Sequence, residues 1–281
     1  MDLIADADAL GDDARLLAQH QAAITLLQAR LAAPGLDQFR WLDLGCGRGQ
    51  ILRALNDALS AEARGLVDYV GYDADLRFAR ETERLALEAR FKSAEVAIGD
   101  LSAFTHVVKP PFDFVTFTNT AHELQPTSLT SVLLEAVRYL SASGTLFVYD
   151  LERIHPPELG AVPWRREEIQ VLVRVMLDAL GAADYRPEVG RWQHRLRTGW
   201  SVQIDRQHVA MSVAEFEDVH QDVLTQLEAN LSLILVKKLD SCRSALESLT
   251  RHGAQTAEEE EGKVDLLFEF WALTRVAGAV Q

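Results

Sequence analysis

The sequence contains little cysteine. Only Cys46 and Cys242 occur among its 281 residues, far apart and in dissimilar contexts. Such a pair indicates neither a disulfide framework nor a cysteine zinc site, so we assign no metal ligands. The scarcity of cysteine fits the reducing cytoplasm, where we expect the protein to lie.

Long apolar runs and an excess of positive charge are absent too. No stretch reaches about 18 uninterrupted apolar residues, so we expect no membrane span. The first ten residues carry three aspartates where a secretory signal places positive charge. Lys and Arg number 28 against 42 Asp and Glu, and the formal net charge of -14 opposes long-range attraction to phosphate backbones. Neither a membrane nor a nucleic acid is therefore an expected partner.

What the sequence does contain is typical of a soluble globular α/β protein. Hydrophobic residues make up 48% and charged residues 25%, and the length allows one elaborated α/β domain. Between Phe39 and Asp150, short apolar runs alternate with stretches of helical spacing, which predicts βαβ units on a doubly wound, mostly parallel sheet. The expected strands are Trp41–Leu44, Tyr69–Tyr72, Val96–Ile98, Phe114–Phe117 and Thr145–Tyr149. Ligands of such sheets bind at the carboxyl ends of the strands.

Other segments before residue 207 show simpler patterns. Helical spacing predicts helices from Asp8 to Ala33 and from Glu167 to Leu180. Several prolines exclude regular structure from Leu151 to Arg166, a long connection that is a candidate lid. Mostly apolar even positions from Arg191 to Arg206 argue against a hairpin with a two-residue turn and leave one long strand, which we favour, or a hairpin with an odd-numbered loop. The five arginines from Arg186 to Arg206 are interpreted as a solvated outer face.

The C-terminal part is predicted to be largely helical. Ser212 to Glu215 has the form of a capping box, and apolar residues then recur at helical spacing up to Gly253. This pattern predicts a long helix or a helical hairpin. Phe268 to Val276 is interpreted as a final strand of the sheet, which would make the helical segment an insertion, either a cap over the site or a dimer interface.

The most informative segment is Asp43-Leu44-Gly45-Cys46-Gly47-Arg48-Gly49. Three glycines spaced by one residue follow a strand and precede a helix, so the backbone can approach a ligand without interference from Cβ atoms. Dinucleotide-binding enzymes use a similar loop, but their last two glycines are separated by two residues. The glycines alone therefore do not exclude a nicotinamide-dependent oxidoreductase.

This loop resembles the first motif of class I S-adenosylmethionine-dependent methyltransferases, Asp/Glu-x-Gly-x-Gly-x-Gly, and the resemblance extends over residues 39–150. It implies that Asp43 holds the methionine ammonium of S-adenosylmethionine, directly or through water. It also implies that the loop lies against this cofactor through Gly45, Cys46, Gly47 and Gly49.

Two later segments continue the resemblance. Asp73, followed by Ala74, stands where the family has an acid that accepts hydrogen bonds from both ribose hydroxyls. Asp100-Leu101 resembles the segment whose acid accepts from the adenine amino group, while a hydrophobic neighbour covers the ring. A nicotinamide ribose would also suit Asp73, but dehydrogenases have no regular counterpart of Asp100-Leu101.

The fourth strand continues into Asn119-Thr120-Ala121-His122-Glu123. By the same resemblance, Asn119 and Thr120 are expected to contact the methionine part or to shape the acceptor side. His122 or Glu123 could act as a general base for a hydroxyl or amine acceptor. Adenine methylases of nucleic acid have an Asn/Asp-Pro-Pro-aromatic segment here, so we do not expect methylation of base amines.

These observations predict an S-adenosylmethionine-dependent enzyme that methylates an oxygen or nitrogen of a small-molecule or protein acceptor. The alternatives are a catalytically silent S-adenosylmethionine-binding scaffold and a nicotinamide-dependent oxidoreductase. The predicted organisation is an N-terminal helical extension (1–36), a methyltransferase core (37–206), a helical insertion (207–263) that could form a homodimer, and a final strand (264–281).

Overall fold

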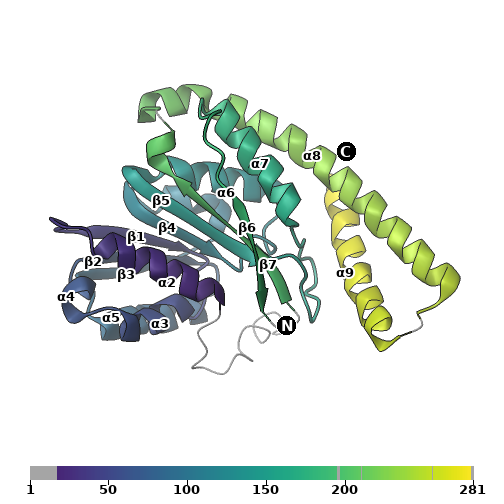
Figure 1. Ribbon diagram of the computed structural model, residues 1–281, viewed down its shortest axis with the longest axis horizontal. Coiled ribbons are helices and arrows are strands. Elements are labelled where there is room, and N and C mark those ends of the chain that lie inside the picture. Colours follow the sequence, from purple (N-terminus) through teal and green to yellow (C-terminus); the bar gives the residue numbers. More distant parts are fainter. Residues whose placement is uncertain (1–17, 195–196, 210, 255, 280–281) are drawn as a thin grey trace.

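The computed structural model describes residues 18–194, 197–209, 211–254 and 256–279 (Figure 1). Within these residues, seven strands form one sheet in the order β3-β2-β1-β4-β5-β7-β6. Strands β1 to β5 are parallel, whereas β7 is antiparallel to β5 and to β6. This confirms the predicted doubly wound, mostly parallel sheet. The strands are β1 (Phe39–Leu44), β2 (Val67–Asp73), β3 (Ser93–Ile98), β4 (Phe112–Thr118), β5 (Leu140–Leu151), β6 (Val189–His194) and β7 (Arg197–Asp205).

Helices cover both faces of the sheet (Figure 1). One face packs against α2 (Ala18–Leu31), α3 (Gln50–Ala58) and α5 (Leu76–Ala89), and the short α4 (Ala61–Arg64) precedes β2. The other face packs against η1 (Leu101–His106), α6 (Pro126–Arg138) and α7 (Arg166–Ala179). Both faces are therefore buried, which explains why the strands read as nearly continuous apolar runs.

The prediction of a single strand from Arg191 to Arg206 is wrong. Two antiparallel strands, β6 and β7, occupy this segment with His194 opposite Arg197, and residues 195–196 between them lie outside the described residues. Trp192 therefore packs beside Tyr149 on one face, whereas Trp200 is buried on the other and donates to the Trp164 carbonyl at 2.8 Å. The alternation of apolar and polar residues did not distinguish one strand from two, because apolar side chains are buried on both faces of this sheet.

The final strand predicted from Phe268 to Val276 is also wrong, because this segment lies in helix α9 (Ala257–Ala279). A short run rich in apolar residues does not by itself distinguish a strand from a buried helix. Strands β6 and β7 already complete the sheet, and the apolar run packs on α8 (Val213–His252) instead, with Ala272 and Leu273 buried. The predicted insertion is thus the first part of a C-terminal helical hairpin.

Helix α8 begins at the predicted capping box. The Ser212 hydroxyl accepts from the Glu215 amide, the Glu215 carboxylate accepts from the Ser212 amide, and the C-cap is Gly253. Its 40 residues span about 60 Å, crossing α6 and α7 before α9 turns back beside it (Figure 1). Buried Lys238 lies 3.1 Å from Glu168 of α7 and 3.2 Å from Glu269 of α9, so one ammonium group connects three helices.

The remaining segments agree with the sequence. Helix α2 corresponds to the predicted N-terminal helix, whose residues before Ala18 lie outside the described part of the chain. Helix α7 matches the helix predicted from Glu167 to Leu180, and residues 152–165 have no regular structure. Among the described helices, none combines the length and the apolar character that crossing a bilayer requires.

Leu227 and Leu233 provide a matched test of how α8 is held. Leu227 is 2% exposed and belongs to the core, whereas Leu233 is 62% exposed. Leu227→Ala leaves a cavity and is expected to lower the free energy of unfolding by about 2–5 kcal/mol. Leu233→Ala is expected to change it by less than about 0.5 kcal/mol. Urea unfolding measures both, and equal effects would contradict the observed packing of α8.

Candidate functional site

The glycine loop after β1 adopts a conformation that favours glycine at three positions. Gly45, Gly47 and Gly49 have φ angles of 68°, 52° and 73°, in the left-handed region. Gly45 has a second constraint, because a Cβ atom there would lie 2.7 Å from Cγ2 of Thr120, the second residue after β4. The loop and the end of β4 therefore approach each other as closely as a glycine allows.

Hydrogen bonds attach this loop to the end of β2. The amides of Gly45 and Cys46 donate to the Tyr72 carbonyl at 2.8 and 3.1 Å, and the Gly47 amide donates to Asp73 Oδ2 at 2.8 Å. The other Asp73 oxygen accepts from the Asp75 amide at 2.8 Å. Burial raises the pKa of Asp73, although these amide hydrogen bonds oppose the effect. The predicted ribose acid thus lies directly against the glycine loop.

Asp43 lies beneath the loop and is 2% exposed. Its carboxylate accepts from the Thr116 hydroxyl at 2.7 Å and from the Tyr69 hydroxyl at 3.2 Å. Burial raises the pKa of Asp43 to about 7, and among the described residues no lysine or arginine offsets this effect. A cationic ligand at this loop would therefore be attracted to the carboxylate.

Cys46 contributes to the loop mainly through its backbone. Its side chain is buried, and a Cβ on Gly71 would lie 3.2 Å from its sulfur, so the thiol is packed over β2. Burial, followed by the negative charges of Asp43 and Asp73, raises the pKa of this thiol well above its usual value. Such an environment suppresses thiolate formation and makes a reactive cysteine unfavourable.

The end of β3 lies at the same edge of the sheet as the glycine loop. Asp100 is exposed and caps η1, where its Oδ1 accepts from the amide and hydroxyl of Ser102 at 2.8 and 2.6 Å. Leu101 is buried, and Ala74 after β2 is exposed. The Tyr72 hydroxyl donates to the Asp100 carbonyl at 3.2 Å, which joins the ends of β2 and β3.

Asn119, directly after β4, has an unusual backbone and an unusual side chain. Its φ angle is 54°, and its Oδ1 atom is buried without a hydrogen-bond partner among the described residues. Buried acceptors normally have a partner, so this oxygen suits a ligand that donates a hydrogen bond. The neighbouring Thr120 is the residue that meets Gly45.

His122 is held by the end of β5. Its Nδ1 lies 2.6 Å from Asp150 Oδ1, and its amide donates to Asp150 Oδ2 at 2.8 Å. Asp150 is completely buried. The Nε2 atom of His122 lies 3.4 Å from Oε2 of Glu158 and 3.9 Å from Oε1 of Glu123. One ring nitrogen therefore faces an orienting carboxylate, and the other faces two more carboxylates.

Opposing effects set the charge of this histidine. Burial alone lowers the pKa of His122, but the carboxylate of Asp150, with Glu158 and Glu123, outweighs it and raises the pKa well above its usual value. The ligand atoms of His122, Glu123 and Glu158 all lie within 4.8 Å of one another, so these residues could also hold a metal ion. The sequence had suggested no metal ligand.

Two residues of this cluster, Asp150 and Glu158, were not predicted from the sequence. Asp150 is the second-last residue of the buried strand β5, which pairs with β4, and a polar residue at that position was a usable signal. Glu158 lies in the irregular segment 152–165, where no pattern pointed to it. This segment reaches the site because the Val162 amide donates to the His122 carbonyl at 2.8 Å.

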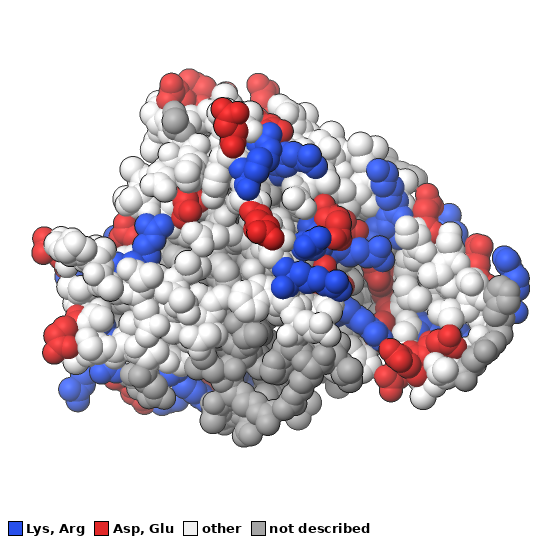
Figure 2. All heavy atoms as spheres, in the orientation of Figure 1, with Lys and Arg blue, Asp and Glu red and all other residues white. Residues whose placement is uncertain are grey.

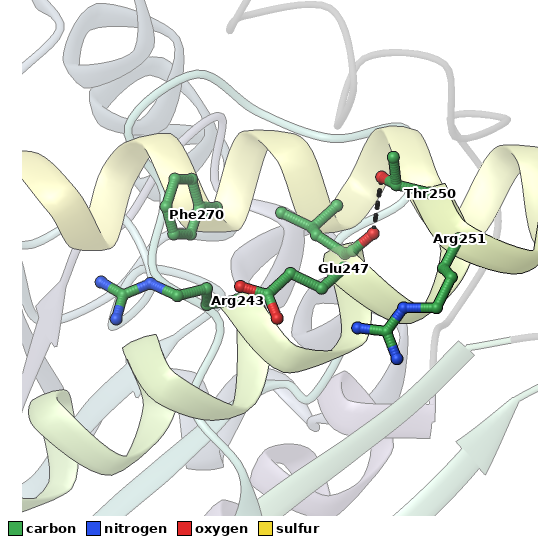
Figure 3. Close-up of a pocket in the computed structure, with 6 residues that line it drawn as sticks. Arg243, Glu247, Thr250, Arg251 and Phe270 are labelled. Carbon is green, nitrogen blue, oxygen red and sulfur yellow. Dashed lines mark hydrogen bonds between the residues drawn. The ribbon is translucent and has the colours of Figure 1, made fainter.

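A groove and an arginine-rich segment are two further surface features. An open groove between α8 and α9 is lined by Arg243, Leu246, Glu247, Thr250, Arg251 and Phe270 (Figure 3). It contains none of the predicted site residues. In the arginine-rich segment, Arg186 pairs with Asp178 and Arg191 with Glu152; Arg195 lies outside the described residues. Acidic and basic side chains are intermixed on the face shown in Figure 2.

The fold and the site together define a class of protein. A parallel β3-β2-β1-β4-β5 sheet with a glycine-rich first loop and an acid ending the second strand is typical of Rossmann-like proteins that bind nucleotide cofactors. Residues 42–146 match a protein family described as a methyltransferase domain. Residues 42–146 are thereby shown to form a methyltransferase domain, as the resemblance to class I S-adenosylmethionine-dependent methyltransferases had implied.

Solved structures share this fold. Magnesium protoporphyrin IX methyltransferase (ChlM) from Synechocystis PCC 6803 with bound SAH is 14% identical, with a TM-score of 0.50 over 73% of this chain and 94% of that chain. The DszA carbon methyltransferase is 17% identical, with a TM-score of 0.50 over 75% of this chain and 59% of that chain. No curated protein matches the sequence. At these identities the likeness establishes the fold.

The pKa of Asp43 predicts a pH-dependent stability. It is about 7 in the folded protein, against about 3.9 in an unfolded chain. A raised pKa means that the carboxyl contributes stability that is fully present below about pH 4 and is lost as pH rises through about 7. Asp43→Asn retains an acceptor for Thr116 but cannot ionise. Relative to wild type, the variant should therefore gain a few kcal/mol between these pH values.

Urea unfolding of both proteins without ligand, at pH steps from 4 to 8, measures this difference. Other titrating groups contribute equally to both proteins and cancel. A difference that stays constant with pH would show that Asp43 has an ordinary pKa.

Proposed function

We propose that the chain binds S-adenosylmethionine at the glycine loop and transfers its methyl group to an oxygen or nitrogen of a small-molecule or protein acceptor. The observation that carries this proposal is the convergence of the glycine loop, Asp73 and Thr120 at the carboxyl edge of the sheet. In a sheet of this type, that edge is where the cofactor binds.

Three features fit this cofactor in particular. Gly45 brings the loop backbone against Thr120, because a Cβ atom at this position would overlap the threonine side chain. Asn119 Oδ1 is a buried acceptor without a partner among the described residues, which suits an ammonium donor. The carboxylate of Asp43 is buried without a compensating cation among the described residues, and S-adenosylmethionine carries both an ammonium and a sulfonium. Its methionine part would therefore meet complementary charge and hydrogen-bonding groups.

The remaining cofactor residues retain their proposed roles. Asp73 already accepts two amides, but each carboxylate oxygen has two acceptor sites, so it can still bind the ribose hydroxyls. Asp100 and Leu101 are proposed for the adenine, with Ala74 beside the ribose. Both oxygens of Asp43 accept protein hydrogen bonds, which favours contact with the ammonium through water.

Bound S-adenosylmethionine supplies an electrophilic methyl group. The protein has to exclude water and align the acceptor with that group. We propose that His122 and Glu123, after β4, face the acceptor. Asp150 fixes the imidazole so that Nε2 points toward Glu158 and Glu123. The general-base role suggested for His122 or Glu123 stays a prediction.

The alternatives differ from this proposal in specific ways. Dinucleotide-binding enzymes have the strand order 3-2-1-4-5-6, whereas this sheet ends in the antiparallel pair β7 and β6. That difference disfavours the nicotinamide-dependent oxidoreductase. A silent scaffold would share the fold and the cofactor, so only a transfer assay separates it from an enzyme. Dimerisation through the helical hairpin also stays a prediction.

Two variants test the cofactor site. Gly45→Ala places a Cβ against Thr120, and Asp73→Ala removes the acid that holds Gly47. Loss of a hydrogen bond to a charged group costs about 1.5–3 kcal/mol. We therefore expect S-adenosylhomocysteine to bind about 10- to 100-fold more weakly to both variants by calorimetry.

Gly181→Ala is the matched control for Gly45→Ala. Gly181 also has a positive φ angle of 73°, but a Cβ atom at this position would have no neighbour within 4 Å among the described residues. The backbone penalty is thus similar, while the steric overlap is absent. Unchanged S-adenosylhomocysteine affinity in both Gly45→Ala and Asp73→Ala would refute the site assignment.

Methyl transfer itself is tested by incubating the protein with methyl-labelled S-adenosylmethionine and a cell extract, then resolving labelled metabolites and proteins. Wild type is expected to label an acceptor. His122→Ala is expected to reduce the rate about 10²- to 10⁴-fold while S-adenosylhomocysteine affinity is retained. Binding of the cofactor without labelling of any fraction would support the scaffold, and an unchanged rate would remove His122 from the reaction.

A further inference from the structure

The cluster around His122 has a composition that methyl transfer alone does not require. We propose that Nε2 of His122 and the carboxylates of Glu123 and Glu158 bind one divalent transition-metal ion on the acceptor side of the site. The binding of the ion is independent of the proposed function, whereas its chemical role rests on that function.

The orientation of the His122 imidazole suits a metal ligand. Histidines that bind metals almost always donate their other ring N–H to a carboxylate or carbonyl, which fixes the tautomer and the ring plane. Asp150 provides this contact at 2.6 Å from Nδ1, and it is itself held by the amides of His122 and Leu151. An ion that binds at Nε2 displaces the proton of this nitrogen, so the bound imidazole keeps a proton on Nδ1 alone and faces the other two carboxylates with Nε2.

The spacing of the donor atoms also suits a bound ion. Bonds of about 2.0–2.2 Å to a tetrahedral ion place neighbouring ligand atoms about 3.3–3.6 Å apart. The separation of His122 Nε2 from Glu158 Oε2 is 3.4 Å, and that from Glu123 Oε1 is 3.9 Å. Glu123 has an exposed side chain, so a shift of less than about 1 Å would bring its oxygen to the same distance.

Contacts on both sides of Glu158 hold this residue near His122. Helix α9 holds the segment that carries it, because Asp265 pairs with Arg153 at 2.6 Å and with His155 at 3.2 Å. The hydrogen bond from Val162 to His122 fixes the segment on the other side of Glu158. Two distant parts of the chain thus keep the donor atoms together, as a preorganised site requires.

Charge and donor type indicate which ion fits. Three carboxylates, Glu123, Glu158 and Asp150, surround a single imidazole, so a dication would reduce the repulsion among them. Calcium and magnesium prefer oxygen ligands alone. One imidazole nitrogen with carboxylate oxygens suits an ion between manganese and zinc in the transition series.

Three protein ligands would leave a coordination position open for the acceptor. A hydroxyl or phenol oxygen bound there loses its proton to solvent more readily. That oxygen would then form the bond to the methyl carbon as the carbon–sulfur bond breaks and its electron pair stays on sulfur. The proposed acceptor class is accordingly an oxygen nucleophile. In this mechanism His122 acts as a metal ligand and not as a general base.

Titration of the metal-free, full-length protein with Mn²⁺, followed by calorimetry and by electron paramagnetic resonance, tests the site. One ion per chain is expected.

His122→Gln and Glu158→Gln remove ligands and should weaken Mn²⁺ binding at least about 10-fold. Asp150→Asn should weaken it about 10- to 100-fold, because it changes the contact that orients the imidazole. Glu228→Gln, an exposed glutamate on α8, is the control and should bind Mn²⁺ like wild type. Zn²⁺ competing for bound Mn²⁺ should displace it.

S-adenosylhomocysteine affinity is measured on the same samples. Glu158→Gln is the decisive variant, because it lies on an irregular segment outside the cofactor loop. Absence of Mn²⁺ and Zn²⁺ binding, or equal binding in wild type and Glu158→Gln, would overturn the metal site. Loss of the site with intact S-adenosylhomocysteine binding leaves the proposed function standing, whereas Mn²⁺ binding without S-adenosylhomocysteine binding supports the site and overturns that function.

Discussion

The close approach of Gly45 to Thr120 is the constraint on which the rest of the site depends. A backbone without a Cβ atom lets the β1 loop contact the end of β4, while Tyr72 and Asp73 hold the same loop at the end of β2. The loop thereby joins the ends of three adjacent strands. Asn119 and His122 are the first and fourth residues after β4, so their positions depend on this contact as well.

The acceptor side is built in a different way, from the ends of β4 and β5 and from the C-terminal helices. Asp150 orients His122, and the segment after β5 brings Glu158 to the same imidazole. Helix α9 holds that segment through Asp265, while Lys238 connects α7, α8 and α9. The helical hairpin is therefore connected to the site, although it follows the completed sheet in sequence.

The sequence predicted the parallel core well, because apolar runs, helical spacing and the glycine loop all indicated the same arrangement. It also predicted the start of α8 from the capping box at Ser212. It failed where local patterns have two interpretations. Alternation from Arg191 to Arg206 did not reveal the hairpin, since both faces of the sheet are buried. The apolar run from Phe268 to Val276 fitted a strand as well as the buried face of α9.

By itself, the sequence determined the parallel part of the sheet, the loop that lies at its edge and the acids Asp43, Asp73 and Asp100 at or just after the ends of its first three strands. These features are local, because strand ends and glycine conformations are encoded by neighbouring residues. Only the tertiary structure decided that Asp150 and Glu158 meet His122 and that Asp43 is buried without a cation among the described residues. Such contacts join residues far apart in the chain, and their distances and burial arise only when the sheet and helices pack.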